Sequence, residues 1–423
     1  MTAAASTPAT LVIRHCRQLI TCAGPAPRAG ARMGDLDPIA DGAIAVAGEQ
    51  ILFAGPTADL HRSASLAPGV RVIDAPYSSL VPGFVDAHTH ALFAGDRLDE
   101  LRLRLAGATY GEIASNGGGI LSTVRATRNS TVGDLVAASR TRFDDMLANG
   151  TTTCEVKSGY GLTTSSELTM LRAIREIDAL HPIDLVPTFM GAHEVPPEFR
   201  DTRADYIRTI VEEMIPAVAA EKLARWCDVF CETGVFTPEE SAQILEAGVA
   251  AGLEPRIHAD ELGPSGGSEV AARVGARSAD HLVHVSEAGM HALATGGVTA
   301  TLLPSAAFYL KLGRFAPARR LIERSIPVAL ATDVNPGGGF SPSMPFAMTL
   351  ACFAMGMTFE EALVGATING AWSLDMADTV GSLEPGKLAD VVVVRGDAIN
   401  LIRVGAPAVA AVLKRGTLVA GTL

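Results

Sequence analysis

The 423-residue sequence has few cysteines, a deficit of basic residues and no long apolar run. Its six cysteines are scattered and none forms a C-x-x-C pair, which argues against a disulfide framework or a cysteine zinc site. Lys and Arg number 34 against 46 Asp and Glu, a formal net charge of −12, so we expect no nucleic-acid partner. No segment offers about 18 uninterrupted apolar residues, and no basic stretch with an apolar run opens the chain. These features predict a cytoplasmic enzyme without a membrane partner.

Composition and length favour one large α/β unit with a smaller β part. Hydrophobic residues make up 48% of the chain and charged residues 19%, which is typical of a soluble globular protein with a large core. Residues 1–78 and 377–423 consist of short apolar runs interrupted by glycine, and we expect them to form the two parts of one β-sandwich. Residues 79–376 alternate apolar runs with helical segments, the pattern of parallel strands joined by crossover helices.

Eight apolar runs fall within residues 79–376, and eight is the strand number of a (β/α)8 TIM-like barrel. The runs are LVPGFVDAH, TTTCEV, DLVPTFM, CDVFC, EPRIHA, ARSADHL, VTATLLP and PVALATD. Three helix starts are predicted from capping boxes, which pair Thr164 with Glu167, Thr237 with Glu240, and Thr358 with Glu361. The sequence therefore predicts a barrel with helices between its strands.

Polar residues follow several of these runs at the strand ends, where the active site of such a barrel is built. They are His88 and His90 after the first run, His193 after the third, His258 and Glu261 at the fifth, His281 at the sixth and Asp333 after the eighth. On an extended strand the H-x-H spacing puts both imidazoles on one face, and neutral imidazole suits zinc or iron. Together with His258 and Asp333, the pair predicts a metal site with a position left open for water.

The same residues, with the closing GSLEPGKLADVVVV, resemble the amidohydrolase superfamily. Further motifs narrow the resemblance, over nearly the whole chain, to the members that open a ring in histidine degradation. These motifs are FAGDR, RLAGATYGEIASNGGGI, EVKSGYGL, FMGAHEVP, DVFCETGVF, HADELG, SADHL, LLPSAAFYL and ATDVNPG. The resemblance implies a barrel with a β-sandwich from both chain ends, one zinc or iron ion per chain, and a cytoplasmic homodimer. The implied reaction is hydrolysis of a ring carbon–nitrogen bond of 4-imidazolone-5-propanoate, giving N-formimidoyl-L-glutamate.

Three of the strand-end residues are expected to have catalytic roles in this reaction. Asp333, besides binding the metal, is a candidate to take a proton from the attacking water, and His281 is expected to orient that water or stabilise the tetrahedral intermediate. Whether Asp333 or His281 is the main proton acceptor stays open. Glu261 is expected by resemblance to contact the substrate ring and pass a proton to the leaving nitrogen.

The anionic substrate needs a cation in this acidic protein. Arg97, in the loop after the first strand, is expected to pair with its propionate in a bidentate contact. Tyr160, His193 and Asn335 are implied as substrate contacts because each stands in its matching motif. Gly338 occupies a position where the family usually has Ser or Thr, and we expect backbone N–H groups of residues 337–339, including those of Gly337 and Gly338, to replace the missing hydroxyl.

Two alternatives stay open at this point. The nearer one is another mononuclear amidohydrolase, such as a deaminase of a heterocyclic base or a cyclic amide hydrolase, because metal ligands alone do not choose a substrate. Relatives with two metals use a bridging lysine on strand four, whereas strand four here ends at Cys231 and Glu232. The other alternative is a catalytically silent scaffold protein, which the complete ligand set disfavours.

Overall fold

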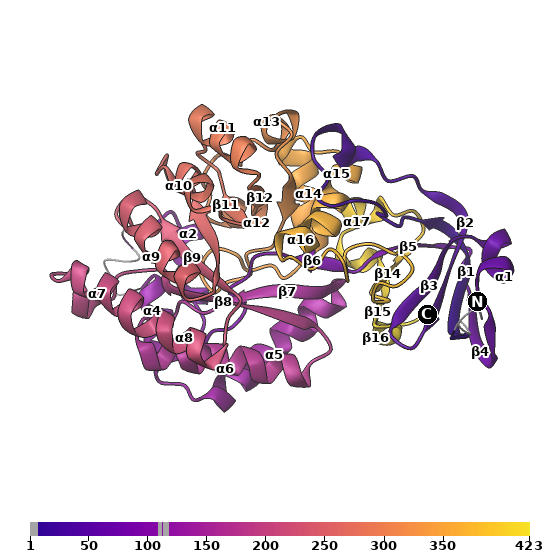
Figure 1. Ribbon diagram of the computed structural model, residues 1–423, viewed down its shortest axis with the longest axis horizontal. Coiled ribbons are helices and arrows are strands. Elements are labelled where there is room, and N and C mark those ends of the chain that lie inside the picture. Colours follow the sequence, from indigo (N-terminus) through magenta and orange to yellow (C-terminus); the bar gives the residue numbers. More distant parts are fainter. Residues whose placement is uncertain (1–6, 109–111, 113–117) are drawn as a thin grey trace.

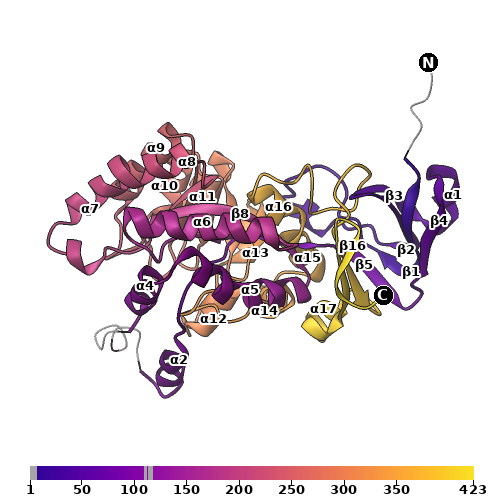
Figure 2. The same ribbon diagram turned by 90° about the horizontal axis from the view of Figure 1, so that it is seen from below.

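A computed structural model describes residues 7–108, 112 and 118–423 of the chain. Residues 109–111 and 113–117, which belong to the motif RLAGATYGEIASNGGGI, lie outside the described part. The structure contains two eight-stranded sheets, a parallel barrel sheet and a mixed sheet that lies beside it (Figures 1 and 2). No helix within the described residues is long and apolar enough to cross a membrane.

The barrel sheet consists of eight strands that pair in chain order, each parallel to the next. They are β6 (Phe84–Asp86), β7 (Thr151–Lys157), β8 (Asp184–Ala192), β9 (Trp226–Cys231), β10 (Glu254–Ala259), β11 (Ser278–His281), β12 (Thr299–Leu302) and β13 (Val328–Leu330). Each predicted run supplies one strand, so the predicted (β/α)8 architecture is confirmed.

Hydrogen bonds beyond the strand ends connect the first strand to the last. The carboxylate of Asp86 accepts from the Thr332 amide at 2.9 Å and from the Thr332 hydroxyl at 2.5 Å. The next bond joins the residues that follow these two: the Asp333 amide donates to the His88 carbonyl at 3.1 Å. These bonds place the residues that follow β6 and β13 side by side.

Helices surround the barrel sheet (Figure 1). They are α2 (Leu98–Leu105), α4 (Ile120–Arg128), α5 (Val132–Ala148), α6 (Thr164–Leu180), α7 (Arg203–Thr209), α8 (Ile215–Glu221), α9 (Pro238–Ala250), α10 (Gly267–Val274), α11 (Glu287–Gly296), α12 (Pro304–Tyr309), α13 (Ala318–Glu323), α14 (Met344–Met355), α15 (Phe359–Ala366) and α16 (Ile368–Ser373). On α6 the residues Leu171, Ile174 and Ile177 are buried in the core, as expected for an apolar stripe at helical spacing.

Two of the three predicted capping boxes are present, those that begin at Thr237 and Thr358. The third is wrong, because α6 begins one residue earlier than predicted, with Thr163 as the residue that caps the helix. Glu167 does not turn back to the cap and instead accepts hydrogen bonds from amides of the preceding loop. An additional box, not predicted, pairs Thr131 with Asp134 at the start of α5.

The mixed sheet has the strand order β16-β15-β14-β5-β1-β2-β3, with β4 paired to β1. Its strands are β1 (Ala9–Leu19), β2 (Ile39–Ala47), β3 (Gln50–Pro56), β4 (Leu66–Asp74), β5 (Ser78–Pro82), β14 (Val391–Arg395), β15 (Val409–Lys414) and β16 (Thr417–Gly421). The short helices α1 (Leu60–Ser63) and α17 (Asn400–Arg403) accompany it. The two chain ends thus share one sheet, as predicted. The strand β5 lies across the expected boundary at residue 78, and it pairs with β1 and β14 in this sheet.

A buried ion-pair cluster connects the mixed sheet to the barrel. The ammonium of Lys414, at the end of β15, lies 2.6 Å from Asp184 at the start of β8 and 2.6 Å from Asp390. The side chains of Lys414 and Asp390 are each 3% exposed, so solvent does little to screen this pair. The cluster lies at the amino ends of the barrel strands, opposite the end where the functional residues gather.

Candidate active site

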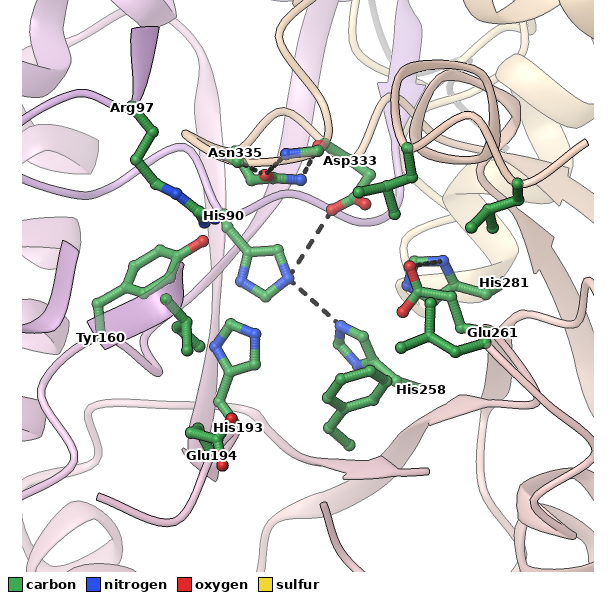
Figure 3. Close-up of a pocket in the computed structure, with 17 residues that line it drawn as sticks. His90, Arg97, Tyr160, His193, Glu194, His258, Glu261, His281, Asp333 and Asn335 are labelled. Atoms are coloured by element: carbon green, nitrogen blue, oxygen red, sulfur yellow. Dashed lines mark hydrogen bonds and ion pairs between the residues drawn. The ribbon is translucent and has the colours of Figure 1, made fainter. Parts of the chain in front are cut away.

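Side chains beyond the carboxyl ends of the barrel strands surround a cavity of about 220 Å³ (Figure 3). Most of the residues predicted to act in catalysis or binding line it together. They are His90, Arg97, Tyr160, His193, His258, Glu261, His281, Asp333, Asn335, Gly337 and Gly338. The remaining one, His88, lies fully buried beneath them and in contact with the rings of His90, His258 and His281.

Four of these side chains present nitrogen or oxygen atoms to one another. Asp333 Oδ1 lies 3.6 Å from His88 Nε2 and 3.8 Å from His90 Nε2, and the Nε2 atoms of His90 and His258 are 3.3 Å apart. Potential ligand atoms of His88, His90 and Asp333 all lie within 4.8 Å of one another, as do those of His88, His258 and His281. The structure therefore adds His281 to the neighbourhood of the predicted ligand set.

The hydrogen bonds of two histidines fix which ring nitrogen faces the centre. His88 Nδ1 lies 2.6 Å from a carboxylate oxygen of Asp280, and His258 Nδ1 lies 3.0 Å from Asp228. A ring that donates from Nδ1 to a carboxylate keeps its lone pair on Nε2.

Two buried polar atoms at this centre, His88 Nε2 and Asp333 Oδ1, have no hydrogen-bond partner among the described residues. Leaving such acceptors unpaired in a buried site is costly, and a cation between them removes that cost. Three imidazole nitrogens and a carboxylate oxygen form a donor set that fits zinc or iron.

Burial keeps the imidazoles in the neutral form that binds metals. It lowers the pKa of His88, His90 and His281 well below the usual value, and it lowers the pKa of His193 to about 3. Burial raises the pKa of the Asp333 carboxyl to about 8, a penalty on its charged form that a bound cation offsets.

Glu261 is placed to act as a proton donor. Burial, together with the nearby carboxylates of Asp333 and Glu232, raises its pKa well above the usual value. Its Oε1 lies 3.5 Å from His281 Nδ1, and both side chains border the cavity (Figure 3). A carboxyl group that keeps its proton at neutral pH can donate it to a leaving group.

Arg97 enters the cavity already paired with an acidic residue. Its Nε donates to Glu100 Oε2 at 2.8 Å and its Nη2 lies 2.6 Å from the same oxygen. The other oxygen of Glu100 accepts from the Gly119 amide at 2.9 Å. Gly337 allows the guanidinium to approach, because a Cβ built at this position lies only 2.0 Å from Arg97 Nη1. We had not predicted Glu100, although its spacing of three residues from Arg97 on a helix start is a usable signal.

Asn335 shapes the glycine loop after β13. Its Oδ1 accepts from the amides of Gly337 at 2.8 Å and Gly338 at 2.6 Å, and its Nδ2 donates to the Asp333 carbonyl at 2.8 Å. Two of the three amides that we expect to replace a missing hydroxyl, those of Gly337 and Gly338, are thus bonded within their own loop. Gly338 does not have a positive φ, and a Cβ there meets only the side chain of Leu310, at 3.1 Å.

The loop that carries Tyr160 depends on a carboxylate from the following helix. Glu167 is fully buried, and its two oxygens accept from the amides of Gly159, Gly161 and Leu162 at 3.0, 2.8 and 2.8 Å. The carbonyl of Gly159 in turn accepts from His193 Nδ1 at 3.0 Å, which leaves the Nε2 of His193 as an acceptor. One carboxylate thus orders the loop that positions both Tyr160 and His193.

Several residues that support the site had not been predicted. Besides Glu100 and Glu167, they are Glu155, Lys157, Asp228 and Asp280, all of which are fully buried. A charged residue within an apolar strand segment is a usable signal, because such residues are almost never fully buried unless they are paired. The sequence does not identify which partner each one finds.

Comparison with known proteins gives close relatives over nearly the whole chain. The amidohydrolase family pattern matches residues 79–422. An imidazolonepropionase of Symbiobacterium thermophilum is 50% identical over 415 residues, which cover 97% of this chain and 97% of that protein. An imidazolonepropionase of Geobacillus kaustophilus is 48% identical over 386 residues, which cover 90% of this chain and 91% of that protein.

Solved structures with lower identity share the fold. A zinc-bound adenosine deaminase from Xanthomonas campestris is 20% identical and matches with a TM-score of 0.68, covering 98% of this chain and 93% of that one. The guanine deaminase of E. coli is 18% identical and matches with a TM-score of 0.69, covering 97% and 99%. At this level of identity the likeness concerns the fold alone.

We predict that Glu167→Ala lowers the free energy of unfolding by about 3 kcal/mol or more, because three buried amides lose their acceptor. Urea denaturation followed by circular dichroism measures the loss. Glu167→Gln, which keeps one acceptor oxygen, is the matched control and is expected to lose less. Equal stability of Glu167→Ala and the unmodified protein would contradict the role of this carboxylate.

Proposed function

This chain belongs to the amidohydrolase family and, within it, to the imidazolonepropionases, and we propose that its cavity hydrolyses 4-imidazolone-5-propanoate to N-formimidoyl-L-glutamate. The observation that carries the proposal is the shared cavity, which holds a convergent set of histidines and an aspartate together with a buried arginine. The histidines and the aspartate suit a hydrolytic centre, and the arginine suits the carboxylate of the substrate.

The proposed cofactor is one zinc or iron ion per chain, held by His88, His90, His258 and Asp333. The unpaired Nε2 of His88 and the unpaired Oδ1 of Asp333 support this set. Such an ion, when bound, makes water acidic, lowering its pKa from about 15.7 toward about 7. The ligand set has the same types of donor for zinc and for iron, so it does not choose between them.

The proton transfers are assigned to three residues of the chain. Asp333 accepts a proton from the attacking water, whose oxygen forms a bond to the ring carbon. His281 orients that water and stabilises the negative charge that develops on the carbonyl oxygen of the tetrahedral intermediate. Glu261 donates its proton to the ring nitrogen as the carbon–nitrogen bond breaks, in keeping with its raised pKa. The proton held by Asp333 then passes through solvent to Glu261. Both carboxyl groups thereby return to their starting states.

The substrate is proposed to lie across the cavity with its propionate toward Arg97. Figure 3 shows Arg97 and Tyr160 on one side of His90, and Glu261 and His281 on the other. An anion beside Arg97 can use guanidinium N–H groups that Glu100 does not occupy, since arginine carries five donors. Tyr160, His193 and Asn335 are proposed to contact the substrate between these two ends. Gly337 and Gly338 are proposed to border it without donating their amides, which Asn335 holds.

Three further proposals concern the whole chain. Residues 79–376 are proposed as the hydrolase barrel, and residues 1–78 and 377–423 as the two parts of the β-sandwich, with β5 contributing to the mixed sheet across the first boundary. The enzyme is proposed to act in the cytoplasm as a homodimer. The buried Arg97 supports a small anionic substrate. The net negative charge of the chain supports the absence of a nucleic-acid partner.

We expect the metal-loaded protein to consume freshly generated 4-imidazolone-5-propanoate. Loss of the ultraviolet absorbance of the substrate and appearance of N-formimidoyl-L-glutamate measure the reaction. Adenine and guanine serve as control substrates, because release of ammonia from either one would favour the alternative of a base deaminase. Metal-loaded protein that leaves the imidazolone unchanged would contradict the proposed activity.

We predict one equivalent of metal per chain, and we predict that His258→Ala loses most of this metal and nearly all activity, because one of four ligands is removed. Elemental analysis after removal of loosely bound ions measures the content. His291→Ala, which changes an exposed histidine, is the control and is expected to keep its metal. A reproducible content of two equivalents in active protein would refute the single-ion site.

We predict that Arg97→Ala lowers kcat/KM about tenfold to a hundredfold while the metal content stays full, because a charge-assisted contact of about 1.5 to 3 kcal/mol is lost. Steady-state kinetics on the imidazolone provide the measurement. Arg102→Ala, which removes an exposed arginine from α2, the helix that follows Arg97, is the control. Unchanged kinetics of Arg97→Ala would show that the propionate is held elsewhere.

A further inference from the structure

Lys157 is a buried cation directly beneath the histidines, and the catalytic steps above do not use it. It ends β7, and its side chain has no exposed surface. We infer that Lys157 is a positioning residue that holds the metal-binding histidines in place through the carboxylates that fix them. This inference rests on the metal site of the proposed function, and it concerns residues that are not themselves ligands.

The ammonium of Lys157 contacts or approaches three carboxylates. Its Nζ lies 2.6 Å from Glu155 Oε1, 2.6 Å from Asp228 Oδ2 and 4.0 Å from Asp280 Oδ2. All three carboxylates are fully buried. Arg256, at 3.4 Å from Asp280, is a second buried cation beside them. The cluster therefore brings three negative charges together around two positive ones, in an interior where unbalanced charge is expensive.

Two of the carboxylates use their remaining hydrogen bonds to orient the rings of proposed ligands. Asp228 Oδ1 accepts from the His258 ring at Nδ1 and from the His258 amide, at 3.0 and 3.2 Å. Asp280 Oδ2 accepts from the His88 ring at Nδ1, at 2.6 Å. Partners of this kind fix the tautomer and direction of a ligand, and their loss typically costs about tenfold to a hundredfold in metal affinity.

The third carboxylate, that of Glu155, holds the backbone between the two histidines that follow β6. Glu155 Oε2 accepts from the amide of Thr89 at 3.1 Å, and the Glu155 carbonyl accepts from the Thr89 hydroxyl at 2.6 Å. Thr89 lies between His88 and His90, so its position sets the direction in which both rings project from the segment that follows β6. One ammonium group thus reaches, through three carboxylates, the residues His88, His90 and His258.

The environment of Lys157 excludes the two roles more often given to a buried lysine in a barrel. Its ammonium lies between carboxylates and is absent from the lining of the cavity, so it does not meet the substrate as a nucleophile. Burial alone lowers the pKa of a lysine, but Asp228 and Glu155 reverse this effect and the net pKa is raised. Lys157 therefore stays a cation, which is unsuited to bridge a second metal ion.

Removal of this charge leaves the carboxylates to repel one another. Glu155 and Asp228 then lose a partner at 2.6 Å and can turn away from the Thr89 amide and the His258 ring that they hold, so these groups lose their fixed direction. The proposed ligands His88 and His258 are each exposed to this loss through one hydrogen bond. The expected result is a weaker and distorted metal site.

The test compares Lys157→Met with Lys414→Met. Lys414 is a matched control, because it is also buried and lies 2.6 Å from each of two carboxylates, but at the contact between the sheets. Each full-length protein is stripped of metal and titrated with Co²⁺ against a chelator, and the visible absorption of bound Co²⁺ is recorded. We expect both variants to lose stability, whereas Lys157→Met alone binds Co²⁺ about tenfold to a hundredfold more weakly, with an altered spectrum.

If Lys157→Met binds Co²⁺ within about twofold of the affinity of the unmodified protein, with an unchanged spectrum, the inference is overturned. An equal loss of affinity in Lys414→Met would also overturn it, because the effect would then follow from stability. Failure of the unmodified protein to bind Co²⁺ would instead remove the proposed metal site itself. If Lys157→Met does not fold, Glu155→Gln provides the test, since it keeps the size of the side chain. Weaker Co²⁺ binding by Glu155→Gln supports the inference, and unchanged binding refutes it.

Discussion

Buried hydrogen bonds between carboxylates and histidine rings are the interaction on which the rest of the site depends. Asp280 and Asp228 hold the Nδ1 atoms of His88 and His258, so both rings present their Nε2 lone pairs to the same point. The carboxylates in turn need a buried cation, and Lys157 and Arg256 supply it. Each part of this arrangement is costly alone and stable only with its partners.

The barrel supplies the geometry that this interaction requires. Its strands point their carboxyl ends to one side, so residues from His90 to Asp333 meet around one cavity. Two of them, His281 and Asp333, have positive φ values of 74° and 54°. Residues other than glycine rarely adopt this backbone conformation. Strain of this kind is found where surrounding structure fixes a functional residue.

The two ends of the cavity differ in the side chains that line them. Glu261 and His281 lie at one end, and the charged Arg97 lies at the other, beside Tyr160. Glu100 holds the guanidinium in place, and the absence of a side chain at Gly337 makes room for it. Arg97 follows β6 and Gly337 follows β13, so loops at the carboxyl ends of the strands build this end of the cavity.

The sequence by itself determined the strands, the mixed sheet formed from both chain ends, and the cluster of strand-end residues around the cavity. These features follow from local patterns: apolar runs of strand length, the H-x-H spacing, and the position of polar residues after each run. The same patterns indicated the helix caps at Thr237 and Thr358.

Only the tertiary structure decided which groups satisfy the buried polar atoms. Glu167 looked like part of a helix cap, yet it bonds a loop that the fold brings to it, and the amides of Gly337 and Gly338 turn to Asn335 instead of to the cavity. Lys157 and Asp228 are 71 residues apart in the chain, and their contact arises only when the barrel forms. The physical reason is that a buried charge is stabilised by whichever partner the fold places beside it, and local sequence does not record that partner.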